Sequence, residues 1–132
     1  MIATTIVAMI ALLQFMLFGI AVGRARGRSG VAAPAVSGNE EFERYFRAHQ
    51  NTMEQLVIML PALFASSYFV HDLFGAVLGL LFIGGRQLYF NRYVNEPTSR
   101  GPGMLLTAVS NLALILGAAI GAVVAVVAKG SL

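Results

Sequence analysis

Four apolar stretches, separated by short polar segments, follow one another along the chain. The first runs without a charge from Met1 to about Val22, which is long enough for the ~20 residues that a helix needs to cross a bilayer. The later ones lie at residues 56–70, 73–94 and 104–128. The pattern predicts one membrane domain over residues 1–132, an all-α bundle of four transmembrane helices at about residues 1–24, 40–70, 73–95 and 102–129.

The polar segments predict where these helices begin and end. Residues 23–38 are basic and contain Gly, Ser and Pro, so we expect an interhelical loop there. Asn39 is a candidate helix cap, followed by glutamates in a first turn where the helix dipole favours acids. Only His71 and Asp72 interrupt the apolar pattern between the second and third helices, which predicts a short antiparallel connection.

Two features of the apolar stretches leave alternatives open. A cleavable signal peptide would begin with a basic region and have an apolar core of roughly 7–15 residues. The first stretch has neither feature, so we expect it to stay in the membrane. In the last stretch, Gly117 and Gly121 lie four residues apart, a spacing that permits close helix contact but is also expected in any helix rich in Gly and Ala.

Composition and charge agree with a membrane protein. Apolar residues make up 58% of the 132 residues and charged residues 11%, against about 45–50% and 25% in soluble domains. The pI near 9.8 does not indicate nucleic-acid binding, because the basic residues alternate with apolar spans. The chain has no cysteine, which excludes disulfides, cysteine nucleophiles and thiolate metal sites.

The basic residues gather at one end of the predicted bundle. With four crossings, eight of the nine lie beside the first and third loops: Arg24, Arg26, Arg28, Arg44, Arg47, Arg86, Arg92 and Arg100. The positive-inside rule then places both loops on the cytoplasmic face and both termini on the other. The Ala-, Gly- and Arg-rich composition, without sorting signals, favours a bacterial inner membrane.

Polar residues recur on one face of the second predicted helix. We call this set the polar stripe; its members follow at spacings of three, four and three: Arg44, Arg47, Asn51 and Glu54. The third helix carries a similar series at spacings of three or four: Arg86, then Tyr89 or Phe90, and Tyr93. Ionisable groups at membrane depth usually face protein or a wet cavity, and an excess of arginine suits an anionic ligand.

The alternative to a ligand site is a buried ion network of Arg47, Glu54 and Arg86 that joins the helices. Phosphate-loop, catalytic-triad and metal-ligand spacings are missing from the sequence.

Two motifs resemble those of a known family. The segment 41–54, EFERYFRAHQNTME, resembles the signature of the MAPEG family, the membrane-associated proteins in eicosanoid and glutathione metabolism, and looks most like microsomal glutathione transferases of types two and three. Residues 86–93, followed by Glu96, Pro97 and Arg100, are similar to the family's third-helix motif. The resemblance covers most of the chain, and two motifs at the correct separation are more specific than one.

The resemblance implies a homotrimer that binds glutathione, as co-substrate, between neighbouring subunits near the cytoplasmic face. The positions that match the family's glutathione contacts are, for the γ-glutamyl carboxylate, Arg47 and Asn51; for its amino group, Glu54 and Tyr89; for the glycine end, Arg26 and His49; and, as a further contact, Tyr93. Arg100 matches the catalytic arginine that activates the thiol.

The chain departs from the family pattern at three positions. Val57 stands where the family commonly has a proline, and Pro61 follows one turn later, so the shape of the lipid-side pocket does not carry over. Gln55 replaces a tyrosine of the leukotriene branch, and Gly27 replaces a second arginine of that branch.

The expected function is that of a membrane-bound enzyme that conjugates glutathione to hydrophobic electrophiles, with reduction of lipid hydroperoxides as a related activity. Glutathione would supply the thiol that this cysteine-free chain lacks. A non-catalytic lipid-binding or scaffold protein of the same fold is the alternative. A small multidrug transporter is less favoured, because such proteins need a carboxylate in the first helix and this one has no charge there.

Overall fold

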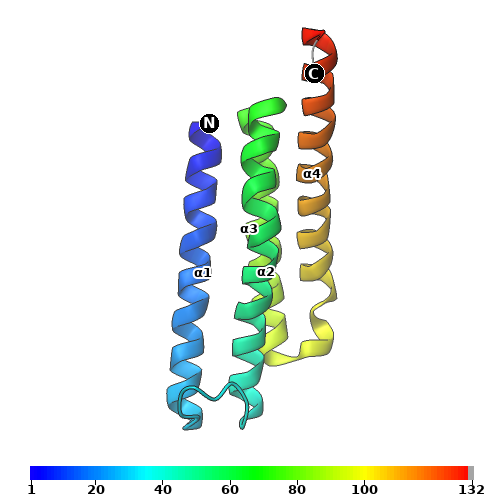
Figure 1. The fold of residues 1–132 in the computed structure, drawn as a ribbon. Coiled ribbons are helices and arrows are strands. Elements are labelled where there is room, and N and C mark those ends of the chain that lie inside the picture. Colours follow the sequence, from blue (N-terminus) through cyan, green and yellow to red (C-terminus); the bar gives the residue numbers. More distant parts are fainter. Residues whose placement is uncertain (131–132) are drawn as a thin grey trace.

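The computed structural model describes residues 1–130 and is a bundle of four helices (Figure 1). The helices are α1 (Ile2–Ser29), α2 (Glu40–Phe69), α3 (Asp72–Asn95) and α4 (Gly101–Lys129), with a short 3-10 turn at Pro97–Ser99. Figure 1 shows the N-terminus and the end of α4 at one end of the bundle, and the α1–α2 and α3–α4 connections at the other. The all-α, four-helix class predicted from the sequence is confirmed.

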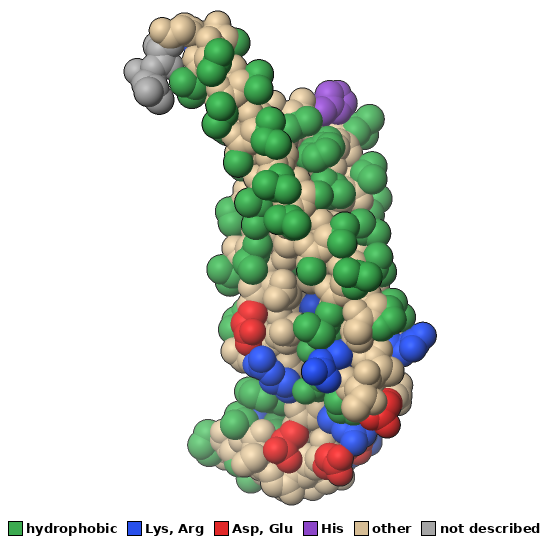
Figure 2. Space-filling model, turned by 90° about the vertical axis from the view of Figure 1, so that its right-hand side faces the viewer, with side chains coloured by type: hydrophobic (Ala, Val, Ile, Leu, Met, Phe, Trp, Pro, Cys, Tyr) green, Lys and Arg blue, Asp and Glu red, His purple; other side chains and the backbone are tan. Residues whose placement is uncertain are grey.

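Three of the helices, α1, α3 and α4, are long and apolar enough to cross a membrane, whereas α2 is charged in its first half. The apolar part of α2, residues 56–70, would reach only about 22 Å at 1.5 Å per residue, less than the ~30 Å hydrocarbon core. The first half of α2 therefore brings charged residues toward the membrane, and in the single subunit the side chains of Arg47 and Glu54 stay partly exposed. Figure 2 shows the division on one face: charged side chains gather at one end and apolar side chains cover most of the remainder.

The first helix is longer than predicted. It ends at Ser29 rather than near residue 24, so Arg24, Arg26 and Arg28 lie on the helix and not in a loop. Arginine and alanine are good helix formers, and basic residues in the last turn interact favourably with the helix dipole. Gly30 then ends the helix with a left-handed φ of 72°, a conformation that glycine adopts without steric cost.

Side-chain caps begin α2 and α3. The Asn39 side chain accepts a hydrogen bond from the backbone N–H of Phe42 at 3.0 Å, as the sequence predicted. His71 Nδ1 accepts one from the Leu73 backbone N–H at 3.1 Å, and only two residues separate the end of α2 from the start of α3. Because this hairpin makes α2 and α3 antiparallel, the charged first half of α2 lies beside the second half of α3, at the end of the bundle away from the hairpin.

One carboxylate holds the end of the bundle that is remote from the arginines. Asp72, the first residue of α3, accepts hydrogen bonds from the backbone N–H groups of Ala3 (3.1 Å) and Thr4 (2.9 Å) and from the Thr4 hydroxyl (2.6 Å). It thereby satisfies backbone donors in the first turn of α1 that have no partner within the helix. The Thr4 hydroxyl also lies 2.6 Å from the Ser67 hydroxyl oxygen, so α1, α2 and α3 meet here.

Glycines allow α4 to approach its neighbours. A Cβ on Gly117 would lie 2.6 Å from the Phe74 ring of α3, and one on Gly121 would lie 2.8 Å from Phe69 Cβ of α2. Real Cβ atoms are not found at such distances. The four-residue spacing of these glycines therefore marks a helix contact rather than a merely Gly-rich helix.

The α3–α4 contact yields a prediction on stability. An added Cβ at Gly103 would lie 2.5 Å from the Tyr89 backbone nitrogen, so Gly103→Ala must push the two helices apart and should lower the free energy of unfolding by about 1–3 kcal/mol. Gly101→Ala is the control, because a Cβ there meets nothing within 4 Å. Thermal unfolding in detergent compares the two variants, and equal midpoints would contradict the close packing.

Candidate functional site

The polar stripe of α2 lies at the arginine end of the bundle and forms ion pairs along the helix. Arg44 donates to Glu40 at 2.6 Å, and Arg47 donates to Glu54 at 2.9 Å. The side chains of Arg47 and Glu54 are 51% and 45% exposed. Exposed ion pairs contribute only about 0–1 kcal/mol to stability, so this pair is not what joins the helices, and a ligand could take the place of either partner.

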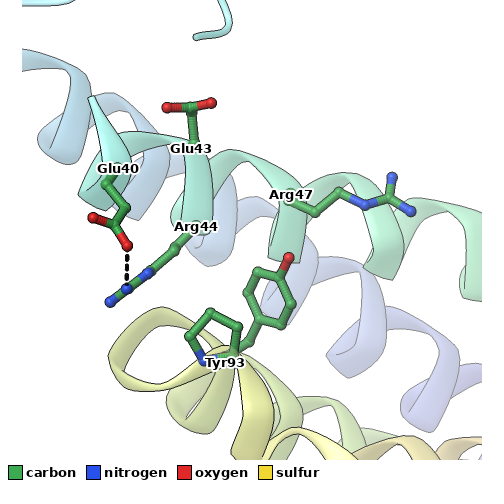
Figure 3. Close-up of a pocket in the computed structure, with 6 residues that line it drawn as sticks. Glu40, Glu43, Arg44, Arg47 and Tyr93 are labelled. Carbon is green, nitrogen blue, oxygen red and sulfur yellow. Dashed lines mark hydrogen bonds and ion pairs between the residues drawn. The ribbon is translucent and has the colours of Figure 1, made fainter. Parts of the chain in front are cut away.

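A polar hollow of about 390 Å³ opens beside the stripe. Its lining residues are Glu40, Glu43, Arg44, Arg47, Tyr93 and Pro97. Figure 3 shows Tyr93 of α3 pointing toward the segment of α2 that carries Arg47, while Arg44 turns toward Glu40. The volume lies at the lower end of the range of about 300–1,000 Å³ for ligand pockets. Its lining carries two arginines and two glutamates, so it suits a ligand that has both an anionic and a cationic group.

Arg86 of α3 is buried between helices although it carries a full positive charge, and only 1% of it is exposed. One terminal nitrogen donates to Asn51 Oδ1 at 2.8 Å and to Thr52 Oγ1 at 2.9 Å, and the other lies 3.4 Å from Thr107 Oγ1. The guanidinium carbon lies 4.1 Å from the centre of the Tyr89 ring, in cation–π geometry. Within residues 1–130, no carboxylate forms an ion pair with it.

A small cavity of about 90 Å³ adjoins this cation. Its lining comes from α2, α3 and α4: Asn51, Gln55, Arg86, Met104, Thr107 and Ala108. Behind it, the side-chain nitrogen of Asn111 donates to Gln55 Oε1 at 3.1 Å, and the buried Asn111 Oδ1 has no partner among the described residues. The site therefore continues from the exposed stripe into a polar interior at membrane depth.

Two aromatic pairs fix the end of α3. Tyr89, which is 3% exposed, stacks on Tyr93 with ring centres 5.4 Å apart. On the other side of α3, Phe90 stacks on Phe18 of α1 at 4.0 Å. Tyr93 thus reaches the hollow from a helix that is anchored on both sides.

Arg26 and His49 lie on the α1 side of the subunit. The Arg26 guanidinium donates to the Ala35 carbonyl oxygen at 2.7 Å and lies 4.5 Å above the Phe42 ring, so it holds the α1–α2 loop. His49 stacks on Phe15 of α1 with ring centres 4.2 Å apart. Both are separated by α2 from the polar stripe.

Arg100 lies in the turn between α3 and α4. It is exposed, and its guanidinium donates to the Pro97 carbonyl oxygen at 2.9 Å. It lines neither of the two hollows described above. The other nitrogens of its guanidinium make no hydrogen bond within residues 1–130.

Among the residues singled out from the sequence, the structure brings one group together and separates a second. The group that meets between α2 and α3 consists of Arg47, Asn51, Glu54, Arg86, Tyr89 and Tyr93. The separated residues are Arg26, His49 and Arg100. The expected alternative, an ion network of Arg47, Glu54 and Arg86, is wrong for Arg86, because this arginine is solvated by neutral oxygens rather than by a carboxylate.

The spacing of polar residues along the sequence did not predict which groups surround Arg86. Thr52 follows Asn51 directly but lies off the stripe, and Thr107 lies in a helix that carries no charge before Lys129. The available signal was a cluster of polar residues in the first half of that helix: Thr107, Ser110 and Asn111. A buried arginine needs such acceptors on the facing helices.

Comparison with known proteins agrees with this architecture. The family model described as "MAPEG family" matches residues 3–120. The chain is 37% identical to human microsomal glutathione S-transferase 2 over 113 residues, which are 85% of this chain and 77% of that protein. It is 32% identical to rat leukotriene C4 synthase over 124 residues, 92% and 83% of the two chains. An uncharacterized protein from Synechocystis is 36% identical over 113 residues, 86% and 82% of the two chains.

The match spans all four helices, because residues 3–120 run from the first turn of α1 well into α4. Both motifs noted in the sequence lie within it. The chain therefore belongs to the MAPEG family.

Proposed function

We propose that the protein is a membrane-bound glutathione transferase that conjugates glutathione to hydrophobic electrophiles. The observation that carries the proposal is the polar stripe beside buried Arg86, which gives a cationic, hydrogen-bonding site to a bundle whose remaining surface is largely apolar. Glutathione brings its own thiol, which a chain without cysteine needs. The names of the transferase and synthase relatives point to the same chemistry.

The Arg47–Glu54 pair matches one end of glutathione in charge. The γ-glutamyl group carries a carboxylate and an ammonium on the same carbon, and the pair presents a cation and an anion 2.9 Å apart. In the proposed complex Arg47 and Asn51 bind the carboxylate, and Glu54, with Tyr89 near it, binds the ammonium. Tyr93 contacts the peptide from the α3 side of the hollow. Charge-assisted hydrogen bonds of this kind are stronger than neutral ones.

The glycine end requires a different surface. Arg26 and His49, the residues proposed for it, lie across α2 from the stripe, so within one subunit the two sets face different sides. A neighbouring subunit that places its α1 side against the stripe would complete the site. The proposed active unit is a homotrimer with glutathione between subunits; the separated faces support a site shared by neighbours, and the number three is what the resemblance to the family implies.

The assembly can be measured directly. We expect the detergent-solubilised protein to have the mass of three chains after subtraction of the bound detergent, as light scattering or native mass spectrometry reports it. The two halves of the proposed site lie on different faces of the subunit, which requires a neighbouring copy, and the resemblance to the family implies three copies. A stable monomer that binds glutathione with full affinity would contradict the trimer.

In the proposed reaction the glutathione thiolate attacks the electrophilic carbon, a C–S bond forms, and the leaving group departs with its electron pair. The protein positions the tripeptide and stabilises the thiolate, a role we assign to Arg100. Apolar substrates would reach the site from the lipid phase. The eight arginines at one end favour a cytoplasmic active site, in a bacterial inner membrane.

The decisive experiment combines binding and turnover. Calorimetry with glutathione in detergent, and conjugation of 1-chloro-2,4-dinitrobenzene followed by absorbance, should both give positive results with wild-type protein. Binding without turnover of this or other electrophiles would favour a non-catalytic member of the fold. Absence of glutathione binding would exclude the proposed function.

A further inference from the structure

The buried guanidinium of Arg86 determines which way the Asn51 side chain faces. Arginine donates hydrogen bonds and accepts none, so the atom of Asn51 that lies 2.8 Å from the terminal nitrogen of Arg86 must be the carbonyl oxygen. The amide nitrogen of Asn51, with its two N–H donors, is then turned away from Arg86. Within residues 1–130, the Asn51 side chain makes no other hydrogen bond, so these donors are available to a ligand.

The guanidinium is itself held in one place by two threonines. The Thr52 hydroxyl donates to the Ala48 carbonyl oxygen at 2.9 Å, and the Thr107 hydroxyl donates to the Gly103 carbonyl oxygen at 2.8 Å. Because each hydroxyl has only one proton, each threonine oxygen is left as an acceptor for Arg86. The acceptors are fixed to the backbones of α2 and α4.

This arrangement keeps the charge of Arg86 uncompensated. Its partners are two hydroxyl oxygens, one amide oxygen and the Tyr89 ring, all of them neutral. A guanidinium stays protonated at any working pH, and a hydrogen bond donated to the Asn51 oxygen polarises the amide so that its N–H groups become better donors. The Asn51 amide is thus oriented and strengthened for an anionic ligand before the ligand arrives.

We propose that Arg86 is a positioning residue that aims the Asn51 amide N–H groups at the α-carboxylate of the γ-glutamyl group. The inference rests on the proposed function for the identity of the ligand. It adds a residue that does not touch glutathione and gives the reason for burying a cation at membrane depth. No carboxylate forms an ion pair with Arg86 within residues 1–130, so the cation is not buried there to form a salt bridge between helices.

The test is a double-mutant cycle read with two ligands. Glutathione is compared with γ-aminobutyryl-cysteinylglycine, which lacks the α-carboxylate, by calorimetry in detergent. Arg86→Met should weaken glutathione binding about threefold to tenfold and change the affinity for the analogue less than twofold. In an Asn51→Ala background, the same substitution should have less than a twofold effect on glutathione, because Arg86 acts through Asn51.

Two further variants provide an independent test and its control. Thr52→Val removes an acceptor of Arg86 and preserves its charge, so it should weaken glutathione binding in the same direction and serves if Arg86→Met does not fold. Ser110→Ala removes a hydroxyl of α4 that donates to the Leu106 carbonyl oxygen and forms no hydrogen bond with Arg86, so it is the control, with affinity expected within twofold of wild type. Equal losses for the two ligands, or a full loss in the Asn51→Ala background, would overturn the inference.

The orientation can also be measured without a ligand, which separates this inference from the proposed function. Side-chain ¹⁵N relaxation of Asn51, assigned through Asn51→Asp, should show an ordered amide in wild type and a mobile one in Arg86→Met. If wild type binds neither ligand, the proposed function fails, and this measurement still decides the orientation. An amide equally ordered in both proteins would refute it.

Discussion

Replacing Arg100 with alanine is expected to lower turnover tenfold or more while changing glutathione affinity much less. A free cysteine-like thiol has a pKa near 8.5, so only a few per cent is thiolate at pH 7. A guanidinium close to the sulfur favours the charged form, and lowering the thiol pKa by about two units would make most of it thiolate. Arg100 is exposed in the α3–α4 turn and bonds only the Pro97 carbonyl oxygen within residues 1–130, so most of its donors are free.

The measurement is a pH titration of bound glutathione by ultraviolet absorbance, where the thiolate absorbs and the thiol does not. Arg100→Ala should shift the titration to higher pH, and Arg100→Lys should restore part of the shift. Arg24→Ala, which removes an exposed arginine from α1, is the control and should behave as wild type. If the Arg100→Ala titration overlays wild type, then Arg26, Arg92 or a tyrosine hydroxyl becomes the better candidate for thiol activation.

Arg47→Ala and Glu54→Ala are each expected to weaken glutathione binding more than tenfold, or ~1.4 kcal/mol. In the free subunit these two side chains satisfy each other at 2.9 Å, and in the complex each would meet the opposite charge of the γ-glutamyl group. Removal of one leaves a ligand charge unpaired in a site that binding has closed to water, where the loss exceeds the value of the pair itself. Arg47→Ala should affect affinity more than turnover, because the carboxylate it binds is present in both the ground and transition states.

The chain offers a matched control on another face. Arg28 and Glu41 form an ion pair at 2.7 Å with both side chains 50% exposed, nearly the same geometry and exposure as Arg47 and Glu54. Arg28→Ala and Glu41→Ala should leave affinity within about twofold of wild type, since surface pairs contribute little to the fold. If all four variants bind alike, the stripe is only a solvated helix face.

The apolar pattern was enough to predict α3, α4 and most of α1, because burial in a membrane leaves long uncharged stretches, whereas in α2 it covers only residues 56–70 and the Asn39 cap was needed to place the start. It did not predict that α1 continues to Ser29, since the arginines there are compatible both with a loop and with a helix that has left the bilayer. Helix propensity and the Gly30 cap decide between these, and both are local effects that a hydropathy pattern does not register.

The candidate site was predictable only in part. Spacing places Arg47, Asn51 and Glu54 on one face, since residues three and four apart are neighbours on a helix. Spacing cannot tell which other helix faces them, and so the threonine acceptors of Arg86 became visible only in three dimensions. The position of the Arg26 side chain could not be predicted either, because it donates a hydrogen bond to the Ala35 carbonyl oxygen and so depends on the conformation of the α1–α2 loop.

The hydrogen bonds between α1 and α3 all lie in the first half of α1. Hydrogen bonds join α1 to α3 at Thr4 and, through the Gln14 side chain, to the Ile83 carbonyl oxygen and Gln87. Beyond Gln14, the described contacts between these two helices are apolar and aromatic. Arg26 lies about 18 Å farther along the axis at 1.5 Å per residue, beyond the reach of these bonds. There α1 is held to α2 instead, by Arg26 above the Phe42 ring and by the Arg28–Glu41 pair, so a displacement of α2 would carry Arg26 with it while the Asp72 end stays attached to α3.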